Sequence, residues 1–304
     1  MSKKNRIEQD SIGKIAVSNE NFWGAQTQRS LKNFKIGNHI MPIEIIRALA
    51  IIKLSCAKVN SKQKILSNKL SAAIVGASKL VLSGKYDRHF PLSVWQTGSG
   101  IQTNMNVNEV IANLANKKLT GKLGTNSPVH PNDHVNKSQS TNDSFPSAIN
   151  IATAMLVKDS LIPSMKRLQT TLKSHSKKWD KIIKVGRTHL QDATPLSLGQ
   201  EFSGYEAMIG SNIKRVEQSF NSLLNLAQGG TAVGSGLNTK KNFDKFVVNE
   251  ISKISKIKFK PAINKFQALA AHDAIVEISG SLNVLTTDLF KIANDIRLLG
   301  SGPR

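Results

Sequence analysis

Cysteine and aromatic residues are scarce in this chain of 304 residues, and each scarcity excludes a class of protein. A single cysteine, Cys56, leaves no partner for a disulfide framework and no set of thiolates for a zinc site. Aromatic residues make up 5% of the sequence, which is few for a protein that stacks nucleic-acid bases on aromatic rings. The scarcity also argues against an all-β core, which depends on aromatic and β-branched pairs across strands.

Long apolar runs are also missing. The apolar stretch over residues 43–59 is interrupted by four charged residues, so it falls short of the ~20 apolar residues that cross a bilayer. These residues are Glu44, Arg47, Lys53 and Lys58. The chain begins Met-Ser-Lys-Lys-Asn-Arg, and no apolar segment of the kind found in a secretory signal follows. We therefore expect no membrane span and a cytoplasmic, reducing location.

Acidic residues are outnumbered, since 42 Lys and Arg against 20 Asp and Glu give a formal net charge of +22. Such a charge suits nucleic acid, an acidic membrane or an anionic substrate. The basic residues form only short pairs and do not alternate with aromatic residues at regular spacing. This pattern favours a solvated, lysine-rich surface over nucleic-acid binding, and its positive field would speed the approach of a dicarboxylate.

Apolar residues recur at helical spacing through most of the chain. The segments expected to be helical are residues 43–56, 66–82, 105–119, 142–179, 195–229 and 264–299. Pro163 is expected to kink the fourth of these, and residues 13–17 suit a strand. The sequence therefore predicts a mainly α fold.

The change from shorter to longer helices predicts two domains. We expect a smaller N-terminal domain over residues 1–139 and a bundle of long helices over residues 140–304. Such helices would be ~45–50 Å long, which exceeds those of ordinary globular proteins. Because each long helix has an apolar stripe to bury, either other chains or a continuation of the sequence must cover it.

Polar or glycine-rich segments lie at the expected loops and helix starts. They are residues 98–104, 130–134, 138–143, 186–192 and 228–236. Small and hydroxylated residues before a helix can present donors to an anion. For 98–104 alone an ordinary glycine-rich turn is favoured over an anion site, and 138–143 also suits a helix cap. The segment 228–236 lacks the lysine and the preceding strand of a nucleotide-binding loop.

Histidines offer two further candidates. His130 and His134 have the spacing of a metal pair, but Pro131 argues against a regular helix through them and no third ligand is apparent. A turn is favoured there, and no metal site is predicted. His189 lies beside Thr188 in a polar segment, and a histidine with a pKa near ~6.5 suits proton transfer at neutral pH.

Taken together, these segments resemble the fumarase/aspartase superfamily, and within it the class II fumarate hydratases of the fumarase C type. The matching segments occur in family order and are Trp-Gln-Thr-Gly-Ser-Gly at 95–100, Asn-Met-Asn-Val-Asn-Glu-Val at 104–110, Val-His-Pro-Asn-Asp at 129–133, Lys-Ser-Gln-Ser-Thr-Asn-Asp at 137–143, Gly-Arg-Thr-His-Leu-Gln-Asp-Ala-Thr-Pro at 186–195 and Gly-Gly-Thr-Ala-Val-Gly at 229–234. The similarity covers the chain from Arg6 onward.

The resemblance implies a homotetramer whose central domains form a large helical bundle, with active sites built from three chains. It implies a hydro-lyase of the tricarboxylic acid cycle that adds water reversibly to fumarate, giving (S)-malate, without metal or organic cofactor. In the family reaction a base removes a proton from the carbon next to one carboxylate, and charge spreads into that carboxylate as an aci-carboxylate. Hydrogen-bond donors aimed at this charge should contribute most to the rate.

The resemblance also assigns roles by motif. The residues expected to bind the substrate carboxylates are Ser99, Gly100, Ser140, Thr141, Asn142 and Thr188. His189 would be the proton donor and acceptor that handles the water, and it favours water over ammonia because aspartases typically carry Gln at this place. The residues that resemble a second, weaker anion site are His130, Asn132 and Asp133.

Two positions depart from the family pattern. Ile101 stands where the family usually has Thr, and Ser127 stands where an Arg is common near the second anion site. A lost hydrogen bond to a charged group costs roughly 1.5–3 kcal/mol, so roughly 10–100-fold weaker binding is expected from Ile101. The family also continues past the segment that matches 300–304, with a serine loop and a small C-terminal domain, so C-terminal truncation is expected.

That expectation leaves alternatives open. The chain is either part of a working fumarate hydratase or a catalytically inactive fragment or scaffold subunit of one. An aspartase-like ammonia lyase is a third hypothesis. A basic nucleic-acid binder, a fourth, predicts retention on DNA that falls steeply with salt.

Overall fold

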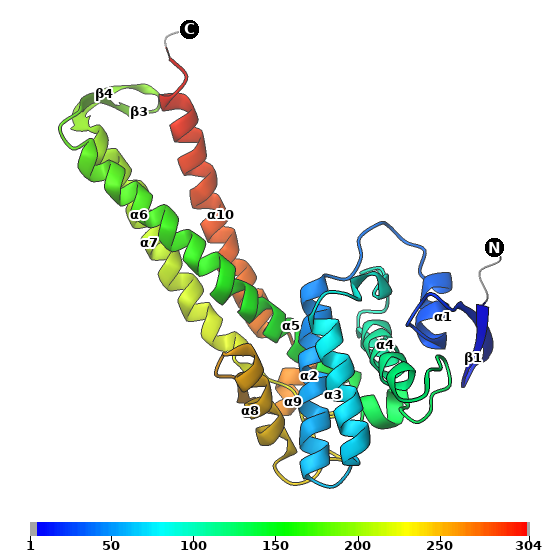
Figure 1. The fold of residues 1–304 in the computed structure, drawn as a ribbon. Helices are drawn as coiled ribbons and strands as arrows, with labels where there is room; N and C mark the ends of the chain where they lie inside the picture. Colours follow the sequence, from blue (N-terminus) through cyan, green and yellow to red (C-terminus); the bar gives the residue numbers. More distant parts are fainter. Residues whose placement is uncertain (1–4, 303–304) are drawn as a thin grey trace. The chain divides into compact units, whose positions relative to one another are not determined.

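The computed structural model describes residues 5–302, and the chain divides into two compact units. Unit 1 comprises Met1–Ala152 and Leu224–His272, and unit 2 comprises Thr153–Leu223 and Asp273–Arg304. Helices predominate in both units, so the mainly α prediction is confirmed (Figure 1).

Unit 1 consists of short strands and a group of helices. Its elements are β1 (Asn5–Asp10), β2 (Gly13–Ser18), α1 (Ala25–Asn33), α2 (Ile43–Lys62), α3 (Asn68–Leu82), η1 (Asp87–His89), α4 (Ile101–Thr120), η2 (Pro131–Val135), most of α5 (Thr141–Leu156), β5 (Asn225–Leu226), α8 (Phe243–Ser255), β6 (Lys260–Pro261) and α9 (Lys265–Ala270). Strands β1 and β2 pair antiparallel with Asn5 opposite Ser18, and β5 and β6 pair parallel. Helices α2, α3 and α4 lie side by side, and α8 packs on α2.

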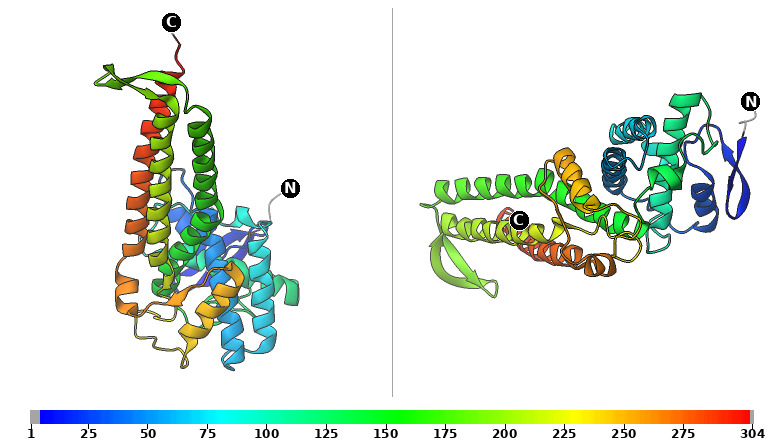
Figure 2. Two further views of the ribbon diagram at one scale, coloured as in Figure 1. Left: turned by 90° about the vertical axis from the view of Figure 1, so that its left-hand side faces the viewer. Right: turned by 90° about the horizontal axis from the view of Figure 1, so that it is seen from below.

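Unit 2 consists of long helices and one hairpin. Its elements are the end of α5, η3 (Val157–Leu161), α6 (Ile162–Lys178), β3 (Ile183–Thr188), β4 (Gln191–Ser197), α7 (Leu198–Leu223) and α10 (Asp273–Leu299). Helix α7 packs along both α6 and α10, and β3 and β4 form an antiparallel hairpin (Figures 1 and 2).

Most of the expected elements are present, and the main differences lie in the long helices. Residues 13–17 form the predicted strand, and a π-helical turn, η3, lies just before Pro163, whose ring nitrogen carries no hydrogen for the usual helical bond. The helix expected from residue 195 starts instead at Leu198, because Pro195 belongs to β4. The helix expected over 264–299 is divided into α9 and α10 by residues 271–272.

The two compact units are not bounded at residue 139. The predicted domain boundary at that residue stays a prediction. Residues 224–272 follow the first long helices in sequence but belong to unit 1. The reason is long-range packing, since α8 lies against α2 and Lys58 Nζ of α2 approaches Glu250 Oε2 of α8 at 3.4 Å.

Buried asparagines of α4 bind the backbone of the surrounding loops. The Nδ2 group of Asn106 donates to the carbonyl of His89 at 3.1 Å. Asn116 both donates to the carbonyl of Val129 and accepts from its N–H, each at 2.8 Å. Because a buried polar backbone group needs a partner, these side chains allow the loops to pack against α4.

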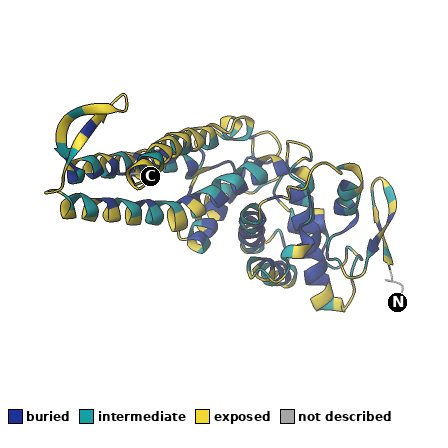
Figure 3. Cartoon of the chain, turned by 90° about the horizontal axis from the view of Figure 1, so that it is seen from above, coloured by how far each residue is buried: buried dark blue, intermediate teal, exposed yellow. Residues whose placement is uncertain are grey.

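Helix α10 buries one narrow stripe. Its buried residues, Ile278, Leu285 and Ile292, recur every seventh position, while Val276 and Phe290 stay 70% and 72% exposed. Figure 3 colours the long helices of unit 2 mainly intermediate and exposed. Within residues 5–302, no helix combines the length and the apolar character needed to cross a bilayer.

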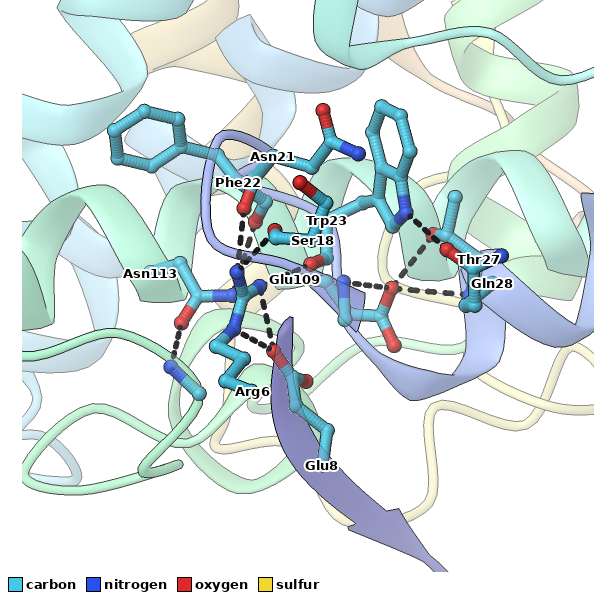
Figure 4. Close-up of polar contacts among 12 residues, drawn as sticks. Arg6, Glu8, Ser18, Asn21, Phe22, Trp23, Thr27, Gln28, Glu109 and Asn113 are labelled. Atoms are coloured by element: carbon cyan, nitrogen blue, oxygen red, sulfur yellow. Dashed lines mark hydrogen bonds and ion pairs between the residues drawn. The ribbon is translucent and has the colours of Figure 1, made fainter. Parts of the chain in front are cut away.

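A buried carboxylate of α4 caps α1 (Figure 4). Gly24 precedes α1 and has no side chain to bind the free N–H groups of its first turn. Glu109 Oε2 accepts instead from the N–H of Gly24 at 2.9 Å and from the hydroxyl of Thr27 at 2.6 Å, and Oε1 accepts from the N–H of Gln26 at 2.8 Å. Burial raises the pKa of Glu109 to about 7, although these donors oppose the rise.

Replacing Glu109 tests this buried group. Because its pKa is raised from 4.5 to about 7 in the folded chain, the folded state holds a proton that the unfolded state has lost between these values. Unfolding free energy should therefore fall as pH rises through this interval, by on the order of 3 kcal/mol. We expect Glu109→Gln to remove this part of the fall in urea titrations at pH 5 and pH 8.

The matched control is Glu44→Gln, at the half-exposed start of α2. It should keep the pH dependence of the unaltered chain. Parallel stability curves for Glu109→Gln and the unaltered chain would show that Glu109 does not titrate in this range.

Candidate active site

The start of α4 offers backbone donors. Gly100 is the residue before the helix and has φ +71°, a left-handed conformation that favours glycine. Gly100 has no side chain to cap the helix, and Gln96 Oε1 accepts from the N–H of Thr103 in its first turn at 3.0 Å. The hydroxyls of Thr97 and Ser99 lie 3.1 Å apart just before the helix. Free N–H groups and the positive end of the helix dipole suit an anion at this place.

The start of α5 carries three of the predicted site residues. Ser140 precedes the helix and its Oγ accepts from the N–H of Asn142 at 3.2 Å. Thr141 is buried, and Asn142 is exposed with its Nδ2 donating to the carbonyl of Ala232 at 2.7 Å. Hydroxyl and amide groups therefore gather at a second helix N-terminus.

A buried carboxylate, Asp143, fixes the start of α5 to a distant loop. Its Oδ1 accepts from the N–H of Ser140, and its Oδ2 accepts from the N–H groups of Gly229 and Thr231, all at 2.9 Å. Gln228 Nε2 donates to the same Oδ2 at 3.2 Å. Burial raises the pKa of Asp143 to about 6 against these donors, so the group is mostly ionised at neutral pH.

The two helix starts lie next to each other. Asn104, one turn into α4, donates from Nδ2 to Thr141 Oγ1 at 2.9 Å. A Cβ on Gly100 would lie 2.4 Å from ring atoms of Phe145 in the first turn of α5, so only glycine fits this approach. The structure thus brings Ser99 and Gly100 together with Ser140, Thr141 and Asn142. 

The buried Lys53, together with Asn136, belongs to the same cluster as Asn104 and Thr141. The sequence analysis did not identify Lys53 or Asn136 as site residues. Lys53 Nζ donates to Asn136 Oδ1 at 2.8 Å and to Gln139 Oε1 at 3.0 Å. Burial lowers the pKa of Lys53 to about 8. The available signal was its position, since Lys53 stands among apolar residues on a helix face that the pattern predicts to be buried.

The residues of the predicted second anion site lie on and before η2. His130 Nδ1 accepts from the N–H of Asp133 at 3.1 Å, and the carboxylate of Asp133 lies 3.3 Å from the same nitrogen. Asn132 is exposed. His134 Nδ1 accepts from the N–H of His130 at 2.8 Å, so this nitrogen is engaged within the turn. That these residues bind an anion stays a prediction.

Thr188 and His189 lie in unit 2, at the tip of the β3–β4 hairpin, and the structure groups them there rather than with the helix starts of unit 1. Thr188 pairs with Gln191, and His189 and Leu190 have φ +54° and +63°. Two successive positive φ values are typical of the two-residue turn that suits the twist of a hairpin. His189 is exposed at this turn.

A metal centre was not expected from the sequence. Among residues 5–302, no group of three or more His, Cys, Asp or Glu side chains is placed to hold a metal ion. The cluster of unit 1 instead consists of amide, hydroxyl and backbone N–H groups around one buried ammonium. Such donors suit an anionic oxygen ligand.

Comparison with known proteins identifies the class. A sequence model of the lyase family matches residues 13–304, and the chain belongs to this family.

Individual relatives of this chain carry the name of the family that the motifs indicate. The class II fumarate hydratase of Rickettsia conorii is 57% identical over 302 residues, which cover 99% of this chain and 65% of that protein. The mitochondrial fumarate hydratase of Saccharomyces cerevisiae is 54% identical over 306 residues, with 100% of this chain and 62% of that protein covered. The crystal structure of the class II fumarase from Schistosoma mansoni matches with a TM-score of 0.96 at 43% identity, over 99% of this chain and 66% of that chain.

These relatives confirm the resemblance to class II fumarate hydratases that the motifs indicate. The chain spans 65% of the length of the Rickettsia protein.

Gly100→Ala tests the close approach of α4 and α5. The new methyl group would meet the Phe145 ring in a left-handed backbone conformation, so we expect the free energy of unfolding to fall by roughly 2–4 kcal/mol. Gly98→Ala is the matched control, because a Cβ there meets nothing within 4 Å. Equal urea midpoints for the two variants would contradict the close packing.

Proposed function

We propose that this chain is part of a fumarate hydratase, which adds water reversibly to fumarate and gives (S)-malate in the tricarboxylic acid cycle. The observation that carries the proposal is the pairing of two helix starts through Asn104 and Thr141, at a hydrogen-bond distance of 2.9 Å. The pairing gathers donors from both motifs that the resemblance assigns to carboxylate binding. The family membership supports the same reaction.

The proposed roles follow from the chemistry of the groups. Ser99, Gly100, Ser140, Thr141 and Asn142 bind the carboxylates of the substrate through hydroxyl, amide and backbone donors. In the direction of dehydration, a base takes the proton from the carbon beside one carboxylate and the charge moves into that carboxylate. Donors already aimed at it stabilise this charge without rearrangement.

Thr188 and His189 complete the proposed site. Thr188 binds a substrate carboxylate, and His189 gives a proton to the departing hydroxide or takes one from the incoming water. His130, Asn132 and Asp133 form the proposed second anion site. The exposure of His189 at the hairpin turn supports this role, because its imidazole is open to a ligand there.

We further propose a homotetramer with sites built from three chains. The exposed apolar residues of α10, such as Val276 and Phe290, support it, because a second copy would cover them. A cytoplasmic location is proposed with it, and the single buried, unpaired Cys56 is compatible with a reducing compartment.

The test of the activity follows the ultraviolet absorbance of fumarate with the 304-residue chain. We expect conversion of fumarate and of (S)-malate but none of aspartate, and His189→Asn should lower turnover roughly 100-fold or more. His39→Asn, at another exposed histidine, is the control and should leave turnover unchanged. Conversion of aspartate would favour an ammonia lyase, and dicarboxylate binding without turnover would favour a scaffold subunit.

Restoring a hydroxyl at residue 101 tests the departure from the family pattern. Ile101 is the first residue of α4 and is 47% exposed at the start of this helix. Ile101→Thr should lower KM for fumarate roughly 10-fold, because it adds a hydrogen bond to a charged group. Ile101→Val has the same branched shape without the hydroxyl and should leave KM unchanged. An equal KM for both variants would show that the hydroxyl does not bind substrate.

A further inference from the structure

The ammonium group of Lys53 is fully buried and donates to neutral amide oxygens. Its side chain is 0% exposed in α2, and its partners are Asn136 Oδ1 at 2.8 Å and Gln139 Oε1 at 3.0 Å. Within residues 5–302, no ion pair with a carboxylate is recorded for Lys53. A buried cation is costly, so its hydrogen bonds constrain the groups that make them.

The lysine fixes the orientation of two asparagine amides. An ammonium has donors and no acceptor, so Asn136 must turn its oxygen toward Lys53. The same Asn136 Oδ1 lies 3.3 Å from Asn104 Nδ2, which must therefore be the donor. The orientation of an asparagine amide is set by such a network, and here each step is determined by the one before it.

The orientation of Asn104 determines what Thr141 can do. The second N–H of Asn104 Nδ2 donates to Thr141 Oγ1 at 2.9 Å, so this oxygen acts as an acceptor inside the protein. A hydroxyl has one hydrogen of its own, which is left for an acceptor elsewhere. Thr141 is the first residue of α5, where the helix dipole favours negative charge. The hydroxyl is therefore set to donate to an anion.

We infer that Lys53 is a positioning residue for carboxylate binding, which fixes the Thr141 hydroxyl as a donor through Asn136 and Asn104. The inference rests on the proposed function, because it takes Thr141 as a contact of the dicarboxylate. Lys53 itself does not touch the substrate in this arrangement. Its charge also adds a fixed positive potential near the start of α5, which favours an anionic ligand.

The charge state of Lys53 gives a second signature. Burial lowers its pKa to about 8, against the opposing effect of the charge on Asp143. The titratable groups that act on it are Cys56 on its own helix and Asp143 on α5. Burial raises the pKa of the Cys56 thiol, which stays neutral in this range, and Asp143, with a pKa of about 6, is already ionised.

The pH dependence follows from these assignments. As pH rises through about 8, Lys53 loses a proton and can accept as well as donate. Asn136 is then free to turn, and the donor direction along Asn136, Asn104 and Thr141 is no longer fixed. Carboxylate affinity should therefore fall as pH rises through this value.

The experiment uses the 304-residue chain with Lys53→Met, which removes the charge and the donors at similar volume. Succinate serves as a non-reacting dicarboxylate in calorimetric titrations, beside KM and kcat for fumarate. We expect the succinate dissociation constant and KM to rise roughly 10-fold with kcat changed less than roughly 3-fold. Lys58→Met, at a lysine of the same helix that pairs with Glu250, is the matched control and should change neither.

A double-mutant cycle separates positioning from a merely structural effect. In a Thr141→Val background, Lys53→Met should weaken succinate binding no further, because its effect passes through the Thr141 hydroxyl. A full additional loss in that background would overturn the inference. Circular dichroism melts establish that each variant is folded.

Succinate affinity of the unaltered chain is also measured over a series of pH values. This measurement needs no variant, so it tests the inference even if Lys53→Met does not fold. We expect succinate affinity to fall above pH 8 in the unaltered chain and to stay level in Lys53→Met. Level affinity in the unaltered chain would overturn the inference. An unaltered chain that neither binds succinate nor converts fumarate would contradict the proposed function as well, whereas binding that Lys53→Met leaves intact contradicts this inference alone.

Discussion

A carboxylate that folding removes from water must be met by hydrogen-bond donors, and Asp143 imposes this requirement on unit 1. Its donors come from the turn before α5 and from the backbone of residues 229–231, far along the chain. Satisfying one buried group therefore determines how a late loop lies against an early helix. The start of α5, where Thr141 and Asn142 stand, is held from both directions, by Asp143 and by the amides bound to Lys53.

Local sequence patterns predict the helices well because the apolar spacing and the terminating residues of a helix lie within its own segment. Apolar spacing and glycine breaks locate the bounds of α3 and α4 to within about four residues, whereas α2 continues to Lys62, past the expected end at residue 56. The β3–β4 hairpin is missed because its strands are mostly exposed and lack a clear alternation, so Pro195 suggests a helix start where β4 ends. Membership of residues 224–272 in unit 1 depends on packing across the chain, which no local pattern records.

The residues of the candidate site likewise fall into those that the sequence predicts and those that it does not. Motif resemblance finds the groups that would meet a ligand, such as Ser140 and Asn142, because the family shares them. It does not find Lys53 or Asn136, and it includes Asn104 in a matching segment without giving it a role. The importance of these three residues lies in which atom each one turns toward its neighbour. Hydrogen-bond direction is a property of the folded network, so it becomes visible only when donors and acceptors are counted in three dimensions.

The turn at His189 has a consequence for how this protein tolerates change. In a two-residue hairpin the pairing of Thr188 with Gln191 fixes which side of the ribbon each neighbouring side chain faces. Between Val185 and Arg187 the register already shifts, so an irregularity on that side of the hairpin is tolerated. Deletion or insertion of one amino acid between Arg187 and Asp192 would instead slip the pairing next to the turn and change the direction of the imidazole. The turn itself is therefore constrained in length more than in composition.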